Sequence, residues 1–289
     1  MKTWLVLDCH YLCYRAFHVS KELSWRGKAT GVIFGFLKSI TSLKDQFQTD
    51  HVIFCFEHPQ LYRRHIYPSY KFKRRTQERT EEEKQAYTEL YDQISLLWKR
   101  YLPKIGFRNV FCFRGMEGDD LMAKIALGRD HEELGEEVIL VTADSDLYQC
   151  LGPRVQIYSP QKQMVLTQEW FEAKYGIPPR KWAVVKALCG CQSDEVEGID
   201  GVGEVTALKY LRKELRPPSK VYQAIVSRRG RSIVRRNRKL VQLPFDGCPT
   251  PYLQEDEITK HAWLEVCNEL GMRSIASHPP IATRRLRHV

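Results

Sequence analysis

The sequence predicts an α/β fold with a mostly parallel central sheet flanked by helices. Four short runs of apolar, β-branched and aromatic residues are typical of buried strands. Helical patterns lie between them, and the alternation of strand and helix indicates a parallel sheet with both faces covered. Each run also ends in a carboxylate or is followed by one within three residues. The expected strands span residues 3–8, 51–57, 109–114 and 137–144.

Helices are expected at residues 31–47, at about 78–101 and at 119–130. After about residue 180 the chain changes to helices, loops and basic runs. The stretch 178–190 has a helix start and a Gly stop, 198–215 has a Gly-rich turn that opens a helix, and 255–270 is amphipathic. We therefore expect a core at 1–180, a helical region at 181–272 and a flexible basic tail at 273–289.

The composition of the chain bears on its partners and its compartment. A formal net charge of +10 attracts polyanions, most often nucleic acid. The stretch SRRGRSIVRRNRK (227–239) either lines a phosphate backbone or forms a solvated charged face. Nine cysteines in scattered, strand-like contexts predict reduced, buried thiols. The apolar run at the start is too short for a signal peptide or a membrane span, so we expect a cytoplasmic protein with no membrane partner.

Carboxylates at the strand ends are the main chemical signal. Because ligands of open α/β sheets bind beyond the carboxyl ends of the strands, these side chains should converge on one pocket. Close, desolvated carboxylates stay ionised only when cations lie among them. Oxygen-only ligands select Mg²⁺ or Mn²⁺ and not zinc, and their number suggests two ions. The residues are Asp8, Glu57, Glu117, Asp119, Asp120, Asp144 and Asp146.

Taken singly, each carboxylate is more often a helix cap or a turn residue. Four strands with the same termination favour the metal site instead. Two ions about 4 Å apart clamp the attacking and leaving oxygens of a phosphoryl displacement. The sequence therefore predicts a basic surface that binds a phosphate backbone and an acidic, metal-filled pocket that cuts it.

The second nucleic-acid signal is GIDGVGEVT (198–206). Gly201 and Gly203 allow close backbone approach immediately before a helix, whose N-terminal N–H groups would face a phosphate oxygen. With a helix on each side, the segment indicates a helix-hairpin-helix that holds DNA without reading its sequence.

The chain resembles the 5′ nuclease family, which includes phage 5′-to-3′ exonucleases, flap endonucleases and the N-terminal nuclease domain of bacterial DNA polymerase I. The matching segments lie between residues 5 and 211 and include LVLDCHYLCYRAFH, YKFKRR, GMEGDDLMA and LVTADSDLYQ. The resemblance implies a PIN-like nuclease core at 1–180 with a helical arch at about 71–100, a DNA-binding region at 181–272, and action as a monomer on branched, flapped or 5′-ended DNA.

The resemblance also implies roles for single residues. Asp8, Glu57, Glu117, Asp119 and Asp120 would hold the first metal ion, and Asp144, Asp146 and Asp194 the second. Lys71 and Arg74 would reach the scissile phosphate, Tyr70 would stack on an unpaired base, and Arg15 would contact phosphate. Gly201, Gly203 and Thr206 would contact DNA at the hairpin, where a K⁺ ion is a further possibility. The same stretch around Lys71 could also be a solvated helix start.

The chain departs from the family pattern at four positions, two of them near the second metal site. In GCQSDE (190–195), Cys191 stands where the family usually has Asp, and Glu195 where it has Asn. Glu57 replaces the usual Asp, and Val205 a frequent Lys. Because a neutral thiol is a poor ligand for Mg²⁺, we expect weaker binding of the second ion and a relative preference for Mn²⁺.

The leading hypothesis is a 5′-to-3′ exonuclease or flap endonuclease that cuts by a two-metal mechanism and leaves 5′-phosphate and 3′-hydroxyl ends. A structure-specific DNA-binding protein with weak or lost catalysis is the main alternative, because two positions near the metal site have changed. A single-strand ribonuclease is a third possibility. A phosphatase with an Asp nucleophile is disfavoured, because LDCHYL lacks a second Asp two residues after Asp8.

Overall fold

A six-stranded sheet forms the centre of the computed structural model, which describes residues 2–128 and 133–280. The strand order is β5-β4-β1-β6-β7-β8, and all neighbouring strands are parallel except the last pair, β7 and β8. The expected mostly parallel sheet is therefore confirmed. Its strands are β1 (Lys2–Asp8), β4 (His51–Cys55), β5 (Val110–Phe111), β6 (Glu136–Val141), β7 (Val155–Ser159) and β8 (Met164–Leu166).

Both faces of the sheet are buried, which explains the unbroken apolar runs. On β1, Trp4 and Val6 pack into one core cluster, while Leu5 and Leu7 pack into another on the opposite face. Since successive side chains of a strand point to opposite faces, a strand covered on both sides needs apolar residues at every position.

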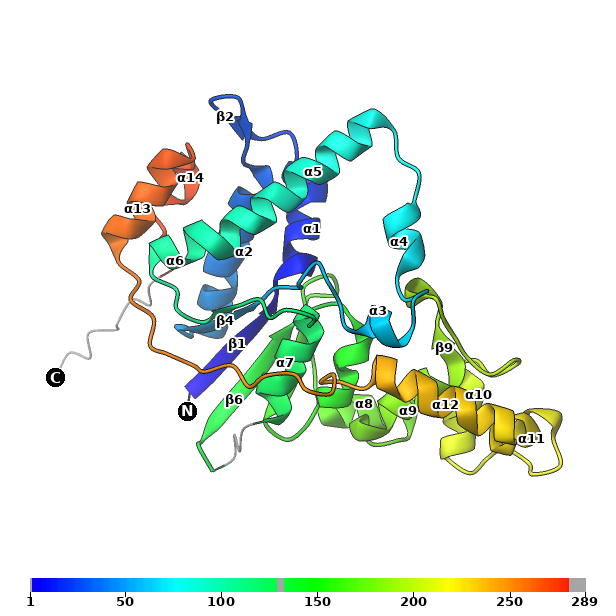
Figure 1. Cartoon of the computed structure of the whole chain (residues 1–289). Helices are drawn as coiled ribbons and strands as arrows, with labels where there is room; N and C mark the ends of the chain where they lie inside the picture. The colour runs from blue at the N-terminus through cyan, green and yellow to red at the C-terminus, as the bar shows by residue number, and fades with distance from the viewer. Residues whose placement is uncertain (1, 129–132, 281–289) are drawn as a thin grey trace.

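One face is covered by helices from both ends of the chain (Figure 1). Trp263 and Cys267, near the C-terminus, pack in the same cluster as Leu12 and Phe36, near the N-terminus. The helices here are α1 (Cys9–Ser20), α2 (Gly31–Phe47), α5 (Glu81–Leu96), α6 (Leu102–Ile105), α13 (Lys260–Glu269) and α14 (Arg273–Ala276). A π-helical turn, Leu97–Tyr101, joins α5 to α6.

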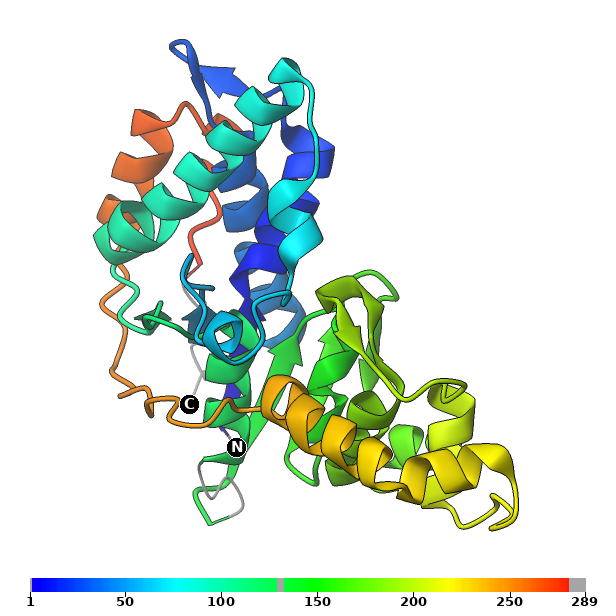
Figure 2. The same ribbon diagram turned by 45° about the vertical axis from the view of Figure 1, so that its right-hand side comes forward.

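The opposite face is covered by α7 (Gly118–Leu127), α8 (Gln168–Tyr175) and α9 (Trp182–Cys189). Three further helices extend from there, as Figure 2 shows: α10 (Glu204–Leu211), α11 (Lys220–Val226) and α12 (Arg228–Val241). The short helices α3 (Arg63–Ile66) and α4 (Phe72–Thr76) lie between α5 and the group formed by α9 to α12. Two small hairpins, β2 (Ser24–Trp25) with β3 (Lys28–Ala29) and β9 (Gly190–Cys191) with β10 (Val196–Glu197), complete the fold.

Several sequence expectations need correction. The strand expected at 109–114 is only Val110–Phe111, because only these two residues pair with β4. The helix expected from 255 begins at Lys260, where the Thr259 side chain caps it by accepting from Ala262 N. The helix expected at 119–130 corresponds to α7, and its last two residues lie outside the described part of the chain. Helix α1 and strands β7 and β8 were not anticipated.

The expected boundaries also differ from the observed packing. Residues 260–276, placed in the helical region and the tail, pack against α6 and the sheet through Trp263, Val266 and Ile275. Residues 273–276 form a helix, so the expectation of a flexible tail from residue 273 is wrong there; residues 281–289 lie outside the described range. Trp182 and Leu188 of the helical region share a cluster with Trp4 of β1, so the two expected regions share one core.

The nine cysteines are free, as predicted, and six of them are buried. Within residues 2–128 and 133–280, no helix combines the length and apolar character needed to cross a membrane.

Candidate active site

A cavity of about 820 Å³ lies at the carboxyl ends of the central strands, and carboxylates from four of them line it. Asp8 ends β1, Glu57 follows β4, Asp119 lies in the first turn of α7 after β5, and Asp144 follows β6. Tyr87, Tyr91 and Trp98, from α5 and the π-helical turn, form the opposite wall. The predicted convergence of these strand-end carboxylates is thus present in the structure.

Asp8 is fixed by its own helix and by a neighbouring strand. Its Oδ1 accepts from Tyr11 N at 3.0 Å as the cap of α1, and its Oδ2 accepts from the Thr142 hydroxyl at 2.9 Å. Burial, with the charges of Asp144 and Glu57, raises the pKa of Asp8 to about 6 although both hydrogen bonds oppose the shift. Burial and the charges of Asp144 and Asp8 also raise the pKa of Asp119 well above its usual value. When they are ionised, these carboxylates therefore carry more negative charge than the surrounding protein cations compensate.

Glu117 lies in the opposite electrostatic situation. Burial alone would raise its pKa, but Lys71 and Arg63 outweigh burial and lower the pKa to about 2. Its Oε2 accepts from the Tyr70 hydroxyl at 2.9 Å and lies 2.9 Å from Arg63 Nη1, while its Oε1 pairs with the Lys71 ammonium. Glu117 is therefore ionised and held by three groups.

Asp120 differs from the other predicted ligands in having no free oxygen position. It is fully buried, and both oxygens accept from the Arg63 guanidinium, at 2.5 and 2.7 Å. Oδ1 also accepts from Phe245 N at 2.7 Å, and Oδ2 from Glu117 N at 3.0 Å. A carboxylate offers about four acceptor positions, and all are used. This geometry gives no support to the metal contact expected of Asp120 and makes Asp120 the anchor of Arg63.

A second group of possible ligands lies beside the cavity. One oxygen each of Asp146 and Asp194 and the sulfur of Cys191 all lie within 4.8 Å of one another. Asp146 comes from the turn after β6, Cys191 ends β9, and Asp194 lies in the loop between β9 and β10. Asp146 Oδ1 is buried and accepts no directed hydrogen bond, but it forms an ion pair with Lys186 Nζ at 2.7 Å.

The residues expected to reach phosphate lie at the base of α4. Lys71 and Arg74 both line the cavity; the Lys71 side chain is 12% exposed and that of Arg74 56%. Arg15 is exposed on α1. Tyr70 is only 4% exposed and bonds Glu117, so the stacking role predicted for it has no exposed ring face here.

The loop from Cys191 to Glu195 holds the start of α4 in place. Lys71 N donates to Asp194 O at 3.0 Å, and Arg74 Nη2 lies 3.0 Å from Asp194 Oδ1. Lys73 N donates to both oxygens of Glu195, at 2.9 and 3.0 Å. Glu195, which stands where the family usually has Asn, therefore caps α4. Lys71, the residue that precedes this helix, supplies no side-chain cap.

The predicted hairpin connects α9 to α10 through the β9–β10 ribbon. Gly201 has φ +74°, which favours glycine, and a Cβ atom at Gly201 or Gly203 would meet nothing within 4 Å. Val202 between them is buried, and Gly203 precedes α10 without a side-chain cap. Thr206 is half-buried in the first turn of α10. The backbone is therefore open to an approaching ligand here.

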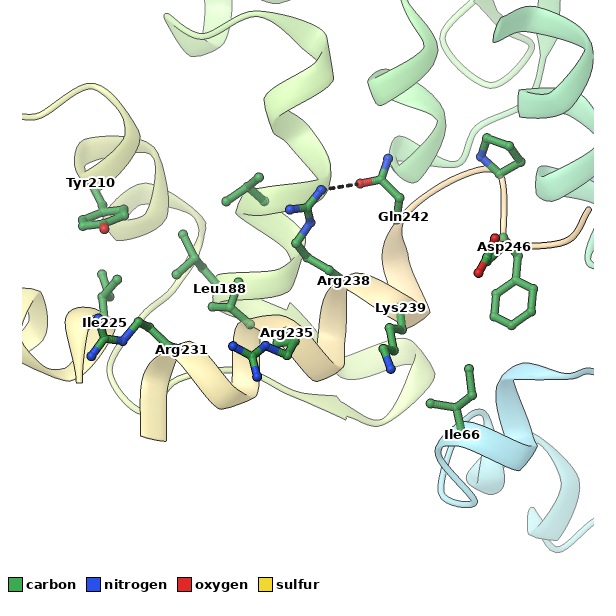
Figure 3. A pocket seen from close by; sticks show the side chains of 14 residues that line it. Ile66, Leu188, Tyr210, Ile225, Arg231, Arg235, Arg238, Lys239, Gln242 and Asp246 are labelled. Atoms are coloured by element: carbon green, nitrogen blue, oxygen red, sulfur yellow. Dashed lines mark hydrogen bonds between the residues drawn. The ribbon is translucent and has the colours of Figure 1, made fainter. Parts of the chain in front are cut away.

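A second cavity, of about 920 Å³, lies along α12, which the basic stretch 227–239 forms (Figure 3). Leu188, Tyr210 and Ile225 are among its apolar lining residues. Arg231, Arg235, Arg238 and Lys239 supply cationic groups, with Arg238 donating to the Gln242 side chain at 3.3 Å. Four of the seven basic residues of this stretch are therefore gathered around one hollow, which Asp246 also lines and which shares no residue with the cavity of the strand-end carboxylates.

Sequence reasoning missed three site residues. His10 Nδ1 accepts from Glu57 N at 3.0 Å, and burial lowers the pKa of His10 to about 4, so the ring is neutral at pH 7. Arg63 holds two of the acidic side chains, and Lys186 holds Asp146. The signal for Lys186 was available, since it is the one charged residue between Trp182 and Cys189.

Comparisons with known proteins find similarity over most of this chain. The family model described as the 5′-3′ exonuclease, N-terminal resolvase-like domain matches residues 3–176. A 5′-3′ exonuclease of Aquifex aeolicus is 31% identical over 215 residues, which cover 74% of this chain and 70% of the relative.

Thermostable DNA polymerase I of Thermus thermophilus is 34% identical over 212 residues, covering 72% of this chain but only 24% of the polymerase. The chain thus matches about a quarter of such polymerases. Among solved structures, a bacteriophage T5 flap endonuclease in a pseudo-enzyme-product complex with DNA and metal ions has a TM-score of 0.71 at 20% identity, covering 96% of this chain and 100% of the T5 chain.

Proposed function

Because the chain belongs to the 5′-3′ exonuclease family, we propose that it is a metal-dependent 5′ nuclease that hydrolyses phosphodiester bonds of DNA. Its substrates would be branched, flapped or 5′-ended DNA, and its products would carry 5′-phosphate and 3′-hydroxyl ends. The observation that carries the proposal is the convergence of Asp8, Glu57, Asp119 and Asp144 on one cavity that Lys71 and Arg74 also line. A binding protein has no need for such a costly group of buried carboxylates.

The donor set fits divalent cations. Burial raises the pKa values of Asp8, Asp119 and Asp144 because no protein cation compensates these carboxylates fully. A bound cation would restore their ionised forms. Asp8, Glu57, Glu117 and Asp119 would hold one Mg²⁺ or Mn²⁺ ion with Asp144 beside them, and Asp146 and Asp194 would take part in holding a second divalent ion. When bound, such ions polarise phosphoryl oxygens and lower the pKa of water.

The side chains around the ions would orient the scissile phosphate. The Lys71 ammonium is charged, because Glu117 and Glu57 raise its pKa against the effect of burial. The ammonium forms an ion pair with Glu117 and therefore lies beside the acidic pocket. There it would stabilise the negative charge that develops on the phosphoryl oxygens. Arg74 would do the same after leaving Asp194. The Tyr70 hydroxyl keeps the Glu117 carboxylate oriented.

DNA would contact two further surfaces. In the proposed arch, α4 and α5 cover the cavity, and the half-buried Tyr87 and the exposed Tyr91 line it, so a single-stranded 5′ end would pass beside these aromatic rings. The hairpin at Gly201 and Gly203, with Thr206, would hold a duplex backbone in the manner of a helix-hairpin-helix, together with a K⁺ ion. The cations of α12 would bind phosphates farther from the cut. We propose that the protein acts as a monomer.

A cleavage assay tests the proposal. A duplex with a labelled 5′ flap is incubated with Mg²⁺, Mn²⁺ or EDTA, beside an Asp119→Asn variant. We expect release of a short labelled oligonucleotide with either ion, none with EDTA, and at least about a hundredfold slower release by the variant. Binding without cutting under every metal would replace the nuclease by a structure-specific DNA-binding protein of the same fold. Faster cutting of single-stranded RNA would favour the ribonuclease.

A further inference from the structure

The side chains of Asp146, Cys191 and Asp194 form a donor set that differs from the remainder of the active site. The larger cavity offers carboxylate oxygens from the strand ends, whereas this set contains a sulfur atom. Cys191 Sγ lies 3.5 Å from Asp194 Oδ2, and the three ligand atoms lie within 4.8 Å of one another. The Cys191 thiol therefore hydrogen-bonds Asp194, and its sulfur lies within 4.8 Å of an oxygen of each carboxylate.

The spacing between Cys191 Sγ and Asp194 Oδ2 suits a small tetrahedral ion. Zinc–sulfur and zinc–oxygen bonds of about 2.3 and 2.1 Å at a tetrahedral angle place sulfur and oxygen about 3.6 Å apart. The distance from Cys191 Sγ to Asp194 Oδ2 is 3.5 Å. Three protein ligands also leave the fourth position free, as in catalytic zinc sites, where a water or a phosphate oxygen can bind.

The charges around the set disfavour Mg²⁺. Asp146 is paired with Lys186 at 2.7 Å, and Asp194 with Arg74 at 3.0 Å. Each carboxylate thus has a protein cation beside it, which weakens its attraction for a hard ion that binds chiefly through charge. The bond between a thiolate and a borderline-soft metal depends less on charge, so Lys186 and Arg74 weaken the binding of such a metal less than that of Mg²⁺.

We propose that Asp146, Cys191 and Asp194 form a site that selects a thiophilic divalent ion, of the zinc and cobalt type, over Mg²⁺. On binding, a metal–sulfur bond replaces the sulfur–hydrogen bond of Cys191, and the proton passes to solvent. This site departs from the expectation that zinc is excluded. The inference rests on the proposed function, because it assigns the identity of the second ion of that nuclease.

Cobalt spectroscopy on the full chain without DNA tests the site directly. Co²⁺ bound to a thiolate gives a sulfur-to-metal charge-transfer band in the near ultraviolet, which oxygen ligands do not give. We expect this band at stoichiometric Co²⁺, its loss when Zn²⁺ is added, and its persistence in excess Mg²⁺. We expect no band in Cys191→Ser or in Cys191→Asp.

Cys189→Ser is the matched control. Cys189 is a half-buried thiol two residues away and lies outside the three-residue donor set. Its variant should keep the band. A band that survives in both Cys191 variants, or its absence from the wild type, would overturn the inference. Circular dichroism identifies any unfolded variant, and the second substitution at Cys191 then carries the test.

Flap cleavage by the same preparations in Mg²⁺ separates this inference from the proposed function. Cleavage by a protein that shows no sulfur band would overturn the thiolate site and leave the nuclease intact. A sulfur band that disappears in Cys191→Ser, together with no cleavage under any metal, would support the site and overturn the nuclease.

Discussion

Arg63 and Asp120 form a buried ion pair with two parallel hydrogen bonds, of 2.5 and 2.7 Å. Both side chains are at most 1% exposed. The same guanidinium lies 2.9 Å from Glu117 Oε2 and donates through Nε to Leu240 O at 2.7 Å. Arg63 therefore joins the start of α7, which supplies carboxylates to the site, to the end of the basic helix α12.

Replacing Arg63 by Met should destabilise the protein by about 3 to 5 kcal/mol, because Asp120 is left buried without its partner. Urea unfolding measures the change. Arg64→Met is the matched control, since Arg64 is half-buried and its guanidinium donates to Pro59 O on the surface, so its loss should cost under about 1 kcal/mol. Adding Asp120→Leu to Arg63→Met should restore part of the stability. Equal stability of wild type and Arg63→Met would contradict this account.

Lys71→Met should lower kcat by about a hundredfold to a thousandfold with a smaller effect on KM, because the charge acts mainly on the transition state. Steady-state kinetics with flap DNA and Mg²⁺ checks this. Lys73 lies on the same helix but is exposed, and Lys73→Met should leave kcat within about twofold. A large rise in KM with unchanged kcat would make Lys71 a binding residue instead.

The stability of the ion-free protein should depend on Asp8 in a defined direction. Its folded pKa is about 6 against an ordinary value of 3.8, so the folded state binds more protons than the unfolded state between these values. The free energy of unfolding therefore falls as the pH rises through this window. Relative to Asp8→Asn, the wild type should lose about 2 to 3 kcal/mol between pH 4 and pH 7 in EDTA.

The comparison with Asp8→Asn is necessary because His10 acts in the opposite sense. Burial lowers the pKa of His10 to about 4, so His10 adds stability as the pH rises. The His10 contribution cancels in the difference between the two proteins. Urea titrations at several pH values measure that difference, and a difference independent of pH would show that the Asp8 pKa is not raised.

Removing Arg231 and Arg235 together should weaken DNA binding and flatten its salt dependence. If both side chains contact phosphates, the slope of log K against log salt should shrink by about 2. Fluorescence anisotropy over a salt series measures it. Lys260→Ala with Arg273→Ala removes the same charge from exposed positions on α13 and α14 and should leave the slope unchanged. Equal slopes in both double variants would remove α12 from the DNA-binding surface.

The strands that were predictable are those buried on both faces. β1, β4 and β6 are continuous apolar runs because helices cover each side, and α2 was predicted with its observed bounds. β7 was missed because Gln156 interrupts its apolar run. α1 was missed because it begins immediately after Asp8, the last residue of β1, so no turn residues separate the strand from the helix.

The site was predictable where a residue follows a strand and hidden where its role depends on distant partners. Asp8 and Asp144 follow their strands, so topology alone brings them together. Arg63 meets Asp120 across 57 residues, and no local pattern marks the pair. The same contact explains why Asp120, although next to Asp119 in the chain, has no oxygen left for an ion.

Asp194 serves two parts of the molecule at once. Its backbone oxygen and its carboxylate hold Lys71 and Arg74 at the base of α4, and the same carboxylate belongs to the sulfur-containing donor set. An ion on Oδ2, the oxygen that accepts from the Cys191 thiol, would share the charge of the carboxylate that holds Arg74 on Oδ1, so ion binding and the Arg74 contact at α4 would be thermodynamically linked. Linkage is reciprocal. A DNA strand that draws Arg74 onto its own phosphate would raise the affinity for the ion, and the bound ion would raise the affinity for that strand by the same factor. In the proposed nuclease, substrate and metal would then act as allosteric effectors of each other through one shared carboxylate.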